Sequence, residues 1–265
     1  MKRFKIFLVT LLLTALTVTG LYAQPNTGMS LSGATGLYSI PSGRIAWERS
    51  SASSAFGIDF GYHTIIAEGN ANNIPKIALS FFNFIELSGA FDFRPEANRE
   101  TDFIGGIKLQ LPLERTALAF GGNYQSINLD SNRQRSAWQV YVATTYAGHF
   151  FAMPAQTTVV VGRTFFEGHS NSNIDFGMGF DILLLPNVFD NLIHWITDFA
   201  NFSYSVAPFR ADAWYRGVLN TGIRLNLSTI PAFSGFRFVA DIMMVDAFDH
   251  NRAFSAGLTF GVPIL

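Results

Sequence analysis

The stretch from Asn173 to Leu185, NIDFGMGFDILLL, alternates apolar with polar or small residues over its whole length. Successive side chains of an extended strand point to opposite faces, so Phe176 and Met178 share one face while Asp181 lies on the other. A strand in a soluble sandwich usually has about 5 or 6 residues. A tilted strand that crosses the hydrocarbon of a bilayer needs about 9 to 11. The length and the alternation together predict a membrane-spanning strand with one face in lipid.

The same alternation recurs along the rest of the chain. The sequence has 27 Phe and a mean hydropathy of +0.23, yet beyond its first 23 residues it contains no apolar run long enough for a membrane helix. Only helices and closed barrels satisfy every backbone polar group in lipid. We therefore expect an all-β fold, an antiparallel up-and-down transmembrane β-barrel of about twelve strands, with ten or fourteen as alternatives. The expected strands are 53–65, 74–82, 84–94, 102–111, 116–127, 137–148, 156–166, 173–185, 201–207, 218–228, 235–245 and 253–262.

One segment departs from this alternation. The apolar residues that follow Pro186 recur at intervals near 3.6, the period of a helix. Proline is tolerated in the first turn of a helix, and tryptophan is typical of the membrane interface. The spacing predicts one short interfacial amphipathic helix near 187–199. Its apolar residues are Val188, Leu192, Trp195, Ile196 and Phe199.

The first 23 residues have the three parts of a secretory signal peptide. Basic residues precede an apolar run from Ile6 to Val18, and cleavage is expected after Ala23. The expected division of the chain is a signal peptide at 1–23, a periplasmic lead-in or inward-tucked segment at 24–52, and an outer-membrane barrel at 53–265. A flexible linker is the alternative for 24–52. The expected location is the cell outer membrane.

Composition excludes several classes of protein. The chain has no Cys, so neither a lipidated N-terminal cysteine nor a disulfide scaffold is possible. The 18 Lys and Arg residues do not outnumber the 19 Asp and Glu residues, so no basic surface for nucleic acid is expected. The expected partners are outer-membrane lipid and, during biogenesis, the barrel-assembly machinery. No cofactor is expected.

A short motif precedes the first expected barrel strand. It resembles the opening motif of the YjbH-type outer-membrane barrels, in which a G-x-T-G-L stretch precedes a proline followed by Thr or Ser. That family is associated with exopolysaccharide production and export, so the resemblance implies a polysaccharide as a possible substrate. The matching residues are Gly33, Thr35, Gly36, Leu37, Ile40, Pro41 and Ser42, with a weaker continuation over 59–63.

Charged residues of both signs fall on the expected inward face, where a polar pore sets its selectivity. The alternative is that opposite charges pair across neighbouring strands and fill the barrel. Acids are in slight excess, which predicts a weak preference for cations if the pore is open. The candidate lumen-lining residues are Asp59, His63, Glu86, Lys108, Arg163, Asp181, Arg224, Arg237 and Asp241, and further inward charges are Lys76, Asp92, Asp102 and Asp175.

The five histidines form no close pair in the sequence, so neither a metal site nor a hydrolase is expected, and the chain is not expected to be an enzyme. The leading hypothesis is a small-solute channel or transport component. The alternatives are a non-transporting surface barrel that displays loops for adhesion or assembly, an accessory barrel for exopolysaccharide export, and a secreted soluble β-sandwich. Polar loops at 67–73, 128–136 and 167–173 are expected outside the cell.

Overall fold

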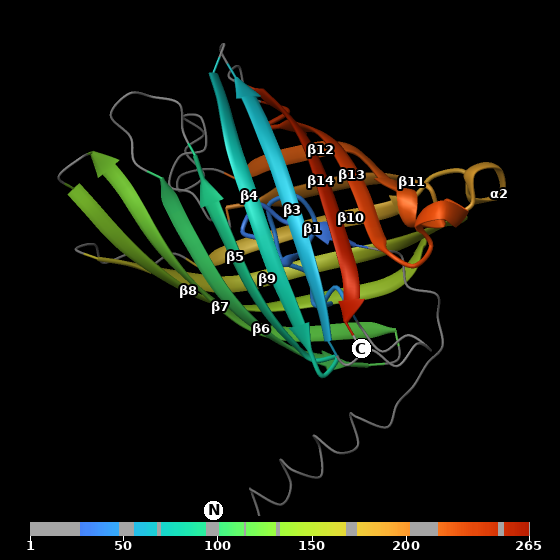
Figure 1. Cartoon of the computed structure of the whole chain (residues 1–265), viewed down its shortest axis with the longest axis horizontal. Helices are drawn as coiled ribbons and strands as arrows, with labels where there is room; N and C mark the ends of the chain where they lie inside the picture. Colours follow the sequence, from blue (N-terminus) through green and yellow to red (C-terminus); the bar gives the residue numbers. More distant parts are fainter. Residues whose placement is uncertain are drawn as a thin grey trace, which may run out of the picture.

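The computed structural model describes residues 27–47, 56–67, 70–93, 101–113, 115–130, 133–167, 174–201, 217–248 and 252–264. Twelve strands of these residues close into one barrel, in the order β10-β11-β12-β13-β14-β3-β4-β5-β6-β7-β8-β9, which Figure 1 shows from the side. Each strand pairs antiparallel with the strands before and after it in the chain, and β14 pairs with β3 to close the ring. The expected antiparallel up-and-down barrel is confirmed.

The strands vary in length from the 8 residues of β5 to the 18 residues of β8. They are β3 (Phe56–Ala67), β4 (Asn70–Phe81), β5 (Ile85–Asp92), β6 (Asp102–Pro112), β7 (Thr116–Asp130), β8 (Arg133–Phe150), β9 (Met153–Phe166), β10 (Asp175–Leu183), β11 (Ile193–Ala200), β12 (Val218–Asn226), β13 (Arg237–Val245) and β14 (Ala253–Ile264). In the described part of the chain, three short helices lie in the connections: α2 (Pro186–Phe189), η2 (Leu227–Thr229) and η3 (Pro231–Phe233).

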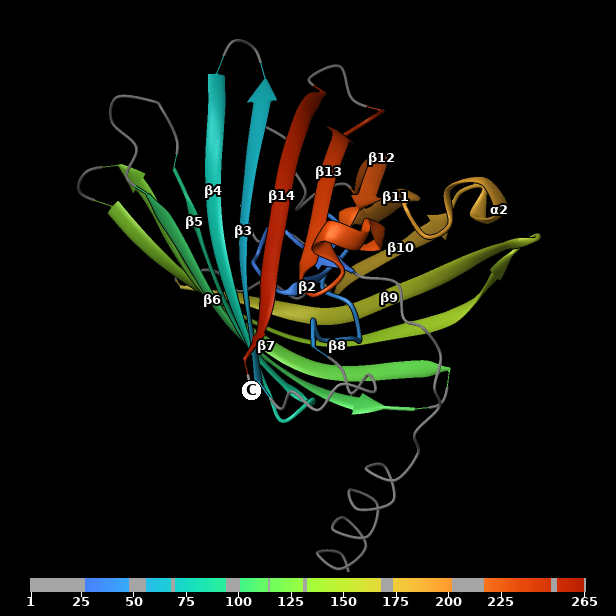
Figure 2. The same cartoon turned by 45° about the vertical axis from the view of Figure 1, so that its right-hand side comes forward.

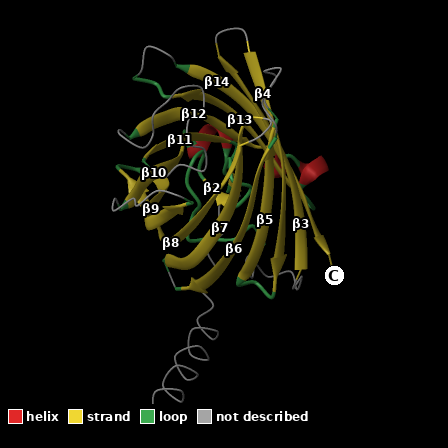
Figure 3. Ribbon diagram, turned by 90° about the vertical axis from the view of Figure 1, so that its left-hand side faces the viewer, coloured by secondary structure: helices red, strands yellow, loops and turns green. Residues whose placement is uncertain are grey.

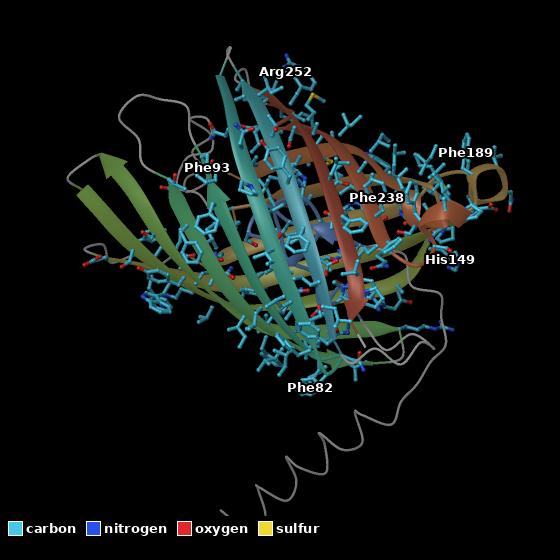
Figure 4. The ribbon with its side chains drawn as sticks, in the orientation of Figure 1. Phe82, Phe93, His149, Phe189, Phe238 and Arg252 are labelled. Carbon is cyan, nitrogen blue, oxygen red and sulfur yellow. The ribbon has the colours of Figure 1, made fainter. Side chains whose placement is uncertain are left out.

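The two faces of the strands differ as the alternation predicts. On β14, buried Ser255, Gly257 and Thr259 alternate with exposed Phe254 and Leu258. The other strands repeat this arrangement, so large apolar side chains cover the outside of the barrel. Figure 4 shows side chains projecting around the outside, with Phe82 at one end of the barrel and Arg252 at the other. Among the described residues, no helix is long and apolar enough to cross a membrane.

The prediction of a helix near 187–199 was wrong over most of this range. Helix α2 has only 4 residues, and Ile193–Ala200 is strand β11, paired with β10 and β12. Trp195 and Phe199 are four positions apart, a spacing that puts two residues on one face of a helix and also on one face of a strand. The strand is favoured because two neighbours supply partners for its backbone groups. The ninth expected strand, 201–207, lies outside the described residues except for Asn201.

Two of the expected polar loops are largely strand. Strand β3 continues to Ala67 and β4 begins at Asn70, while β7 continues to Asp130 and β8 begins at Arg133. Cross-strand pairing satisfies backbone groups whatever the side chains are, so these polar residues extend the hairpins beyond the apolar part of the strands. The third expected loop, 167–173, lies outside the described residues except for Glu167.

Candidate functional site

Residues 27–47 lie inside the barrel, and we call this segment the plug. It contains β1 (Gly28–Met29) and β2 (Thr35–Gly36), which pair antiparallel with each other. Nearly all of its residues are buried. Figure 2 shows the segment in blue within the ring of strands, and Figure 3 shows its loops from another side. The lumen is therefore occupied by the chain's own N-terminal region.

The plug is folded around a tight turn between β1 and β2. The backbone N–H of Ser30 donates to the carbonyl of Ala34 at 2.8 Å, and Gly33 has a φ of 87°, which favours glycine. A Cβ on Gly33 would lie 2.6 Å from the carbonyl oxygen of Gly89 on β5. The turn thus fits the barrel wall only because this residue has no side chain.

Two carboxylates of the barrel wall each bind one residue of the plug through two hydrogen bonds. Glu86 on β5 accepts a hydrogen bond from the backbone N–H of Thr35 at 2.8 Å and another from the Thr35 hydroxyl. Asp198 on β11 accepts from the backbone N–H of Ser39 at 2.7 Å and from its hydroxyl at 2.9 Å. In each case one plug residue supplies two neighbouring donors to the two oxygens of one carboxylate.

Four basic side chains of the wall donate to carbonyl groups of the plug. Each lies at an inward position of its strand and is buried. The plug's backbone therefore finds its partners in the wall, as buried backbone groups require. Lys76 Nζ reaches the carbonyls of Met29 and Ser30, Lys108 Nζ those of Thr35 and Arg44, Arg224 Nη1 that of Gly36, and Arg237 those of Thr27 and Gly28.

Three of these four bases also pair with acids of other barrel strands, Lys108 and Arg224 across adjacent strands and Arg237 across β14. Lys108 Nζ lies 3.0 Å from Glu86, Arg224 binds both oxygens of Asp241, and Arg237 Nη1 lies 3.0 Å from Asp59. All six side chains are at most 2% exposed. A side chain that lines a water-filled passage would be wet, so the described conformation is closed at this level of the barrel.

Both ends of the plug lie at the same ion pair. Arg237 Nε donates to the carbonyl of Thr27 at 2.8 Å, and Trp47 Nε1 donates to Asp59 at 3.0 Å. Arg237 begins β13 and Asp59 lies near the start of β3, so this is the barrel end at which both strands begin. The ring of Tyr38, midway along the plug, lies 5.8 Å from that of His63. Burial raises the pKa of Tyr38 above its ordinary value.

The middle of the plug packs against an apolar part of the wall. The plug contributes Leu31, Leu37, Tyr38 and Ile40. Several wall residues of this cluster lie near the opposite barrel end, where β3 and β11 finish and β14 begins. They include Ile65, Ala67, Ala200, Val245 and Ala253. Polar contacts thus hold the plug along its length, and apolar packing holds its middle.

Neither a protein-family model nor a curated protein matches the sequence. Among solved structures, the KdgM porin aligns with a TM-score of 0.51 at 7% identity, over 78% of this chain and 99% of the porin. The KdgM porin in complex with disordered oligogalacturonate gives 0.51 at 8% identity, over 77% and 98%. Omp33 of Acinetobacter baumannii aligns over 80% and 98%, at 11% identity and a TM-score of 0.45.

The chain has the fold of an outer-membrane β-barrel. The likeness to the KdgM porins rests on the path of the backbone, since hardly any residues are shared. Their fold agrees with the closed ring and the two-faced strands described above.

The structure places eight of the nine candidate lumen residues inside the barrel, each at most 2% exposed. The prediction for Arg163 was wrong. Its side chain is on the exposed face of β9, with its guanidinium 5.2 Å from the centre of the Phe165 ring, while its neighbour Thr164 is buried. The eight buried residues are Asp59, His63, Glu86, Lys108, Asp181, Arg224, Arg237 and Asp241.

The sequence-based prediction missed Asp198 and His194, because both fell within the expected helix. His194 Nδ1 lies 2.6 Å from Asp181, and His63 Nε2 lies 3.5 Å from Asp241. The alternation of Ile193–Ala200 was the available signal for their inward position. Within the described ranges, no group of three His, Cys, Asp or Glu side chains is arranged to hold a metal ion. His169 and His250 lie outside those ranges.

Proposed function

We propose that this protein is an outer-membrane channel for small solutes that the plug holds closed in the described conformation. The observation that carries the proposal is a polar lumen occupied by a separate polar segment. A barrel built only to be solid could fill its interior with side chains of its own strands. Here the strands keep charged groups inward and bind the backbone of another segment instead.

Lipid is the proposed surroundings of the barrel. Apolar side chains cover its outside, and Phe60, Leu258 and Ile242 are each more than half exposed. Burial of such residues in hydrocarbon is favourable, whereas exposure to water would make the surface prone to association. Insertion is proposed to follow export by the signal peptide and to need the barrel-assembly machinery.

The channel is tested by loosening the plug in the full-length chain. A Cβ on Gly57 would lie 2.2 Å from the Trp47 ring, so Gly57→Val should displace that end of the plug. A second way is Thr35→Ala with Ser39→Ala, which removes two plug hydroxyls and leaves the wall intact. We call these the plug-loosened variants. The matched control is Gly122→Val, because a Cβ there meets only the Gln139 carbonyl oxygen at 3.4 Å.

The measurement is ion conductance across planar lipid bilayers. Unaltered protein and Gly122→Val should stay mostly closed, and the plug-loosened variants should open at least about tenfold more often, since each 1.4 kcal/mol of lost plug binding changes the closed-to-open ratio tenfold. Persistence of the barrel form on unheated gels checks folding. Absence of current, with the plug shown to be displaced by labelling of a cysteine at Ser30, would contradict a channel.

A second candidate is a permanently closed barrel that displays its loops for adhesion or assembly. The observation in its favour is the near-complete burial of the lumen residues.

An accessory role in exopolysaccharide export is a further form of the channel proposal, favoured by the position of the motif that resembles YjbH-type barrels. All seven of its residues belong to the plug, and Thr35 is bound by Glu86. The same bilayer measurement separates a closed structural barrel from both transport roles.

A further inference from the structure

The plug is close to neutral and rich in hydroxyl groups. Residues 27–47 contain four Ser and two Thr, and the single charged residue is Arg44. The polar groups of the plug that the wall binds in the closed conformation are therefore mostly backbone carbonyls and N–H groups, with the hydroxyls of Thr35 and Ser39. The groups of the wall that bind it report which chemistry the lumen accommodates.

Two carboxylates of the wall receive pairs of donors that are close together, whereas Asp59, Gln110 and Thr145 each accept a single donor of the plug. Glu86 and Asp198 each bind the N–H and the O–H of one residue, Thr35 or Ser39. The Asp198 carboxylate also accepts from the side-chain amide of Asn220 at 2.8 Å. A carboxylate with two oxygens in one plane binds a pair of neighbouring donors well. Two hydroxyl groups on adjacent carbons form such a pair.

Three of the four basic donors of the wall have their charge compensated by an acid of the wall. Lys108, Arg224 and Arg237 are paired with Glu86, Asp241 and Asp59, and they still donate to neutral carbonyl groups of the plug. An anionic solute would have to compete with these carboxylates for the bases. A neutral oxygen of a solute needs only the donor that the plug carbonyl now uses.

We infer that the solute accepted by the open lumen is neutral and carries adjacent hydroxyl groups, as a saccharide does. This inference rests on the proposed channel. Each pair of adjacent hydroxyls on a sugar ring supplies the two donors that Thr35 and Ser39 supply to Glu86 and Asp198 in the closed conformation. Hydroxyl and ring oxygens of the sugar accept from Lys76, Lys108, Arg224 and Arg237 in place of plug carbonyls.

The test compares two solutes of equal size in a plug-loosened, full-length protein. The first is raffinose, a neutral trisaccharide, and the second is a polyethylene glycol of matching hydrodynamic size, whose ether oxygens accept hydrogen bonds but do not donate them. Ion current through Gly57→Val is recorded as each is added. Raffinose should block the current saturably at millimolar concentration, while the polyethylene glycol should lower it only in proportion to the volume it excludes.

The wall residues are then changed in the same background. Glu86→Gln with Asp198→Asn removes both carboxylates and should raise the half-blocking concentration of raffinose by about tenfold, the loss expected for a charged hydrogen-bond partner. Asp175→Asn is the matched control, because Asp175 is buried but accepts from Thr164 and Gln139 of the wall. It should leave the block unchanged.

Three results bear against the inference. The proposed solute class is overturned if raffinose and polyethylene glycol reduce the ion current equally. It is also overturned if Glu86→Gln with Asp198→Asn does not weaken the block by raffinose. Neither result contradicts the proposed channel. Loss of current in every variant whose plug is displaced overturns the channel and the inference with it. If Gly57→Val does not fold, Thr35→Ala with Ser39→Ala serves as the open background, since it changes no residue of the wall.

Discussion

Neighbouring residues of one strand face different surroundings in this protein. Leu258 is 53% exposed on the outside of β14, and Thr259 next to it is 1% exposed on the inside. In a membrane, the first would contact hydrocarbon and the second the plugged lumen. The cost of a charge at each position then depends on its face and on its depth in the bilayer.

Leu258→Arg should lower the free energy of unfolding by about 2–4 kcal/mol, because Leu258 lies halfway along β14 and should be near the bilayer midplane. Phe254→Arg is the matched control. It is on the same face near the start of the strand and should cost only about 0–1 kcal/mol. Equilibrium unfolding in lipid vesicles measures both. Equal costs would argue against a lipid-facing strand.

For single residues, the sequence predicted most of the lumen-facing side chains. Eight of the nine candidates, chosen because they are polar residues at alternate positions of a strand, are buried inside the barrel. Arg163 was misplaced because Val159, Val160 and Val161 are consecutive, so β9 has apolar side chains on both faces and its parity is ambiguous. Thr164, which bonds to buried Asp175, fixes the parity in the structure. That contact joins neighbouring strands and has no signature within β9 itself.

Among the elements, the plug contributes most to the state of the lumen. Its polar contacts extend from Thr27 to Trp47 and come from most sides of the barrel. The Gly, Ser and Thr of 24–52 permitted an inward segment as well as a linker, and the sequence did not decide between them. The partners that decide are distant in the chain, as in the bond of Ser39 to Asp198, 159 residues apart.

The ion pair at the two plug ends should matter more as a pair than as separate charges. Arg237→Gln leaves Asp59 buried without its base and should cost about 3–5 kcal/mol of the free energy of unfolding. Adding Asp59→Asn removes the isolated charge and should recover most of that loss. Denaturant unfolding of the single and double variants measures the difference, and equal stability of the two would show that the pair is not coupled.

Strand β11 shows where periodicity alone is insufficient. Its outward Trp195 and Phe199 satisfy the helical spacing, while inward Asp198 and His194 mark it as a strand only once its neighbours are known. Long alternating strands such as β3 and β14 were predictable because their alternation spans many residues. An eight-residue segment offers too few positions to separate the two periods.

Over the whole molecule, the lumen is acidic. The described barrel strands bury eight Asp or Glu side chains and four Lys or Arg side chains. Such an excess raises the local concentration of cations in a confined polar space. Because Arg163 faces outward and not into the lumen, the excess of acidic over basic side chains in the lumen is larger than the sequence predicted.

The plug-loosened variants should therefore prefer cations. Reversal potentials in a salt gradient measure the preference, and neutralising Asp59, Glu86, Asp181 and Asp241 together should reduce it. Gly122→Val serves again as the closed control. A preference for anions, or one that the four neutralisations leave unchanged, would show that the buried acids do not set the selectivity.

The shared location of the two plug ends has a topological consequence. Within the described residues, the chain turns back inside the lumen and returns to the end at which it started, next to Arg237 and Asp59. It is a loop laid into the barrel and is not threaded through it. The ring of strands can therefore close before this loop docks, and the loop can leave without any pair of strands separating. This geometry allows assembly of the barrel and occupation of its interior to be two separate events.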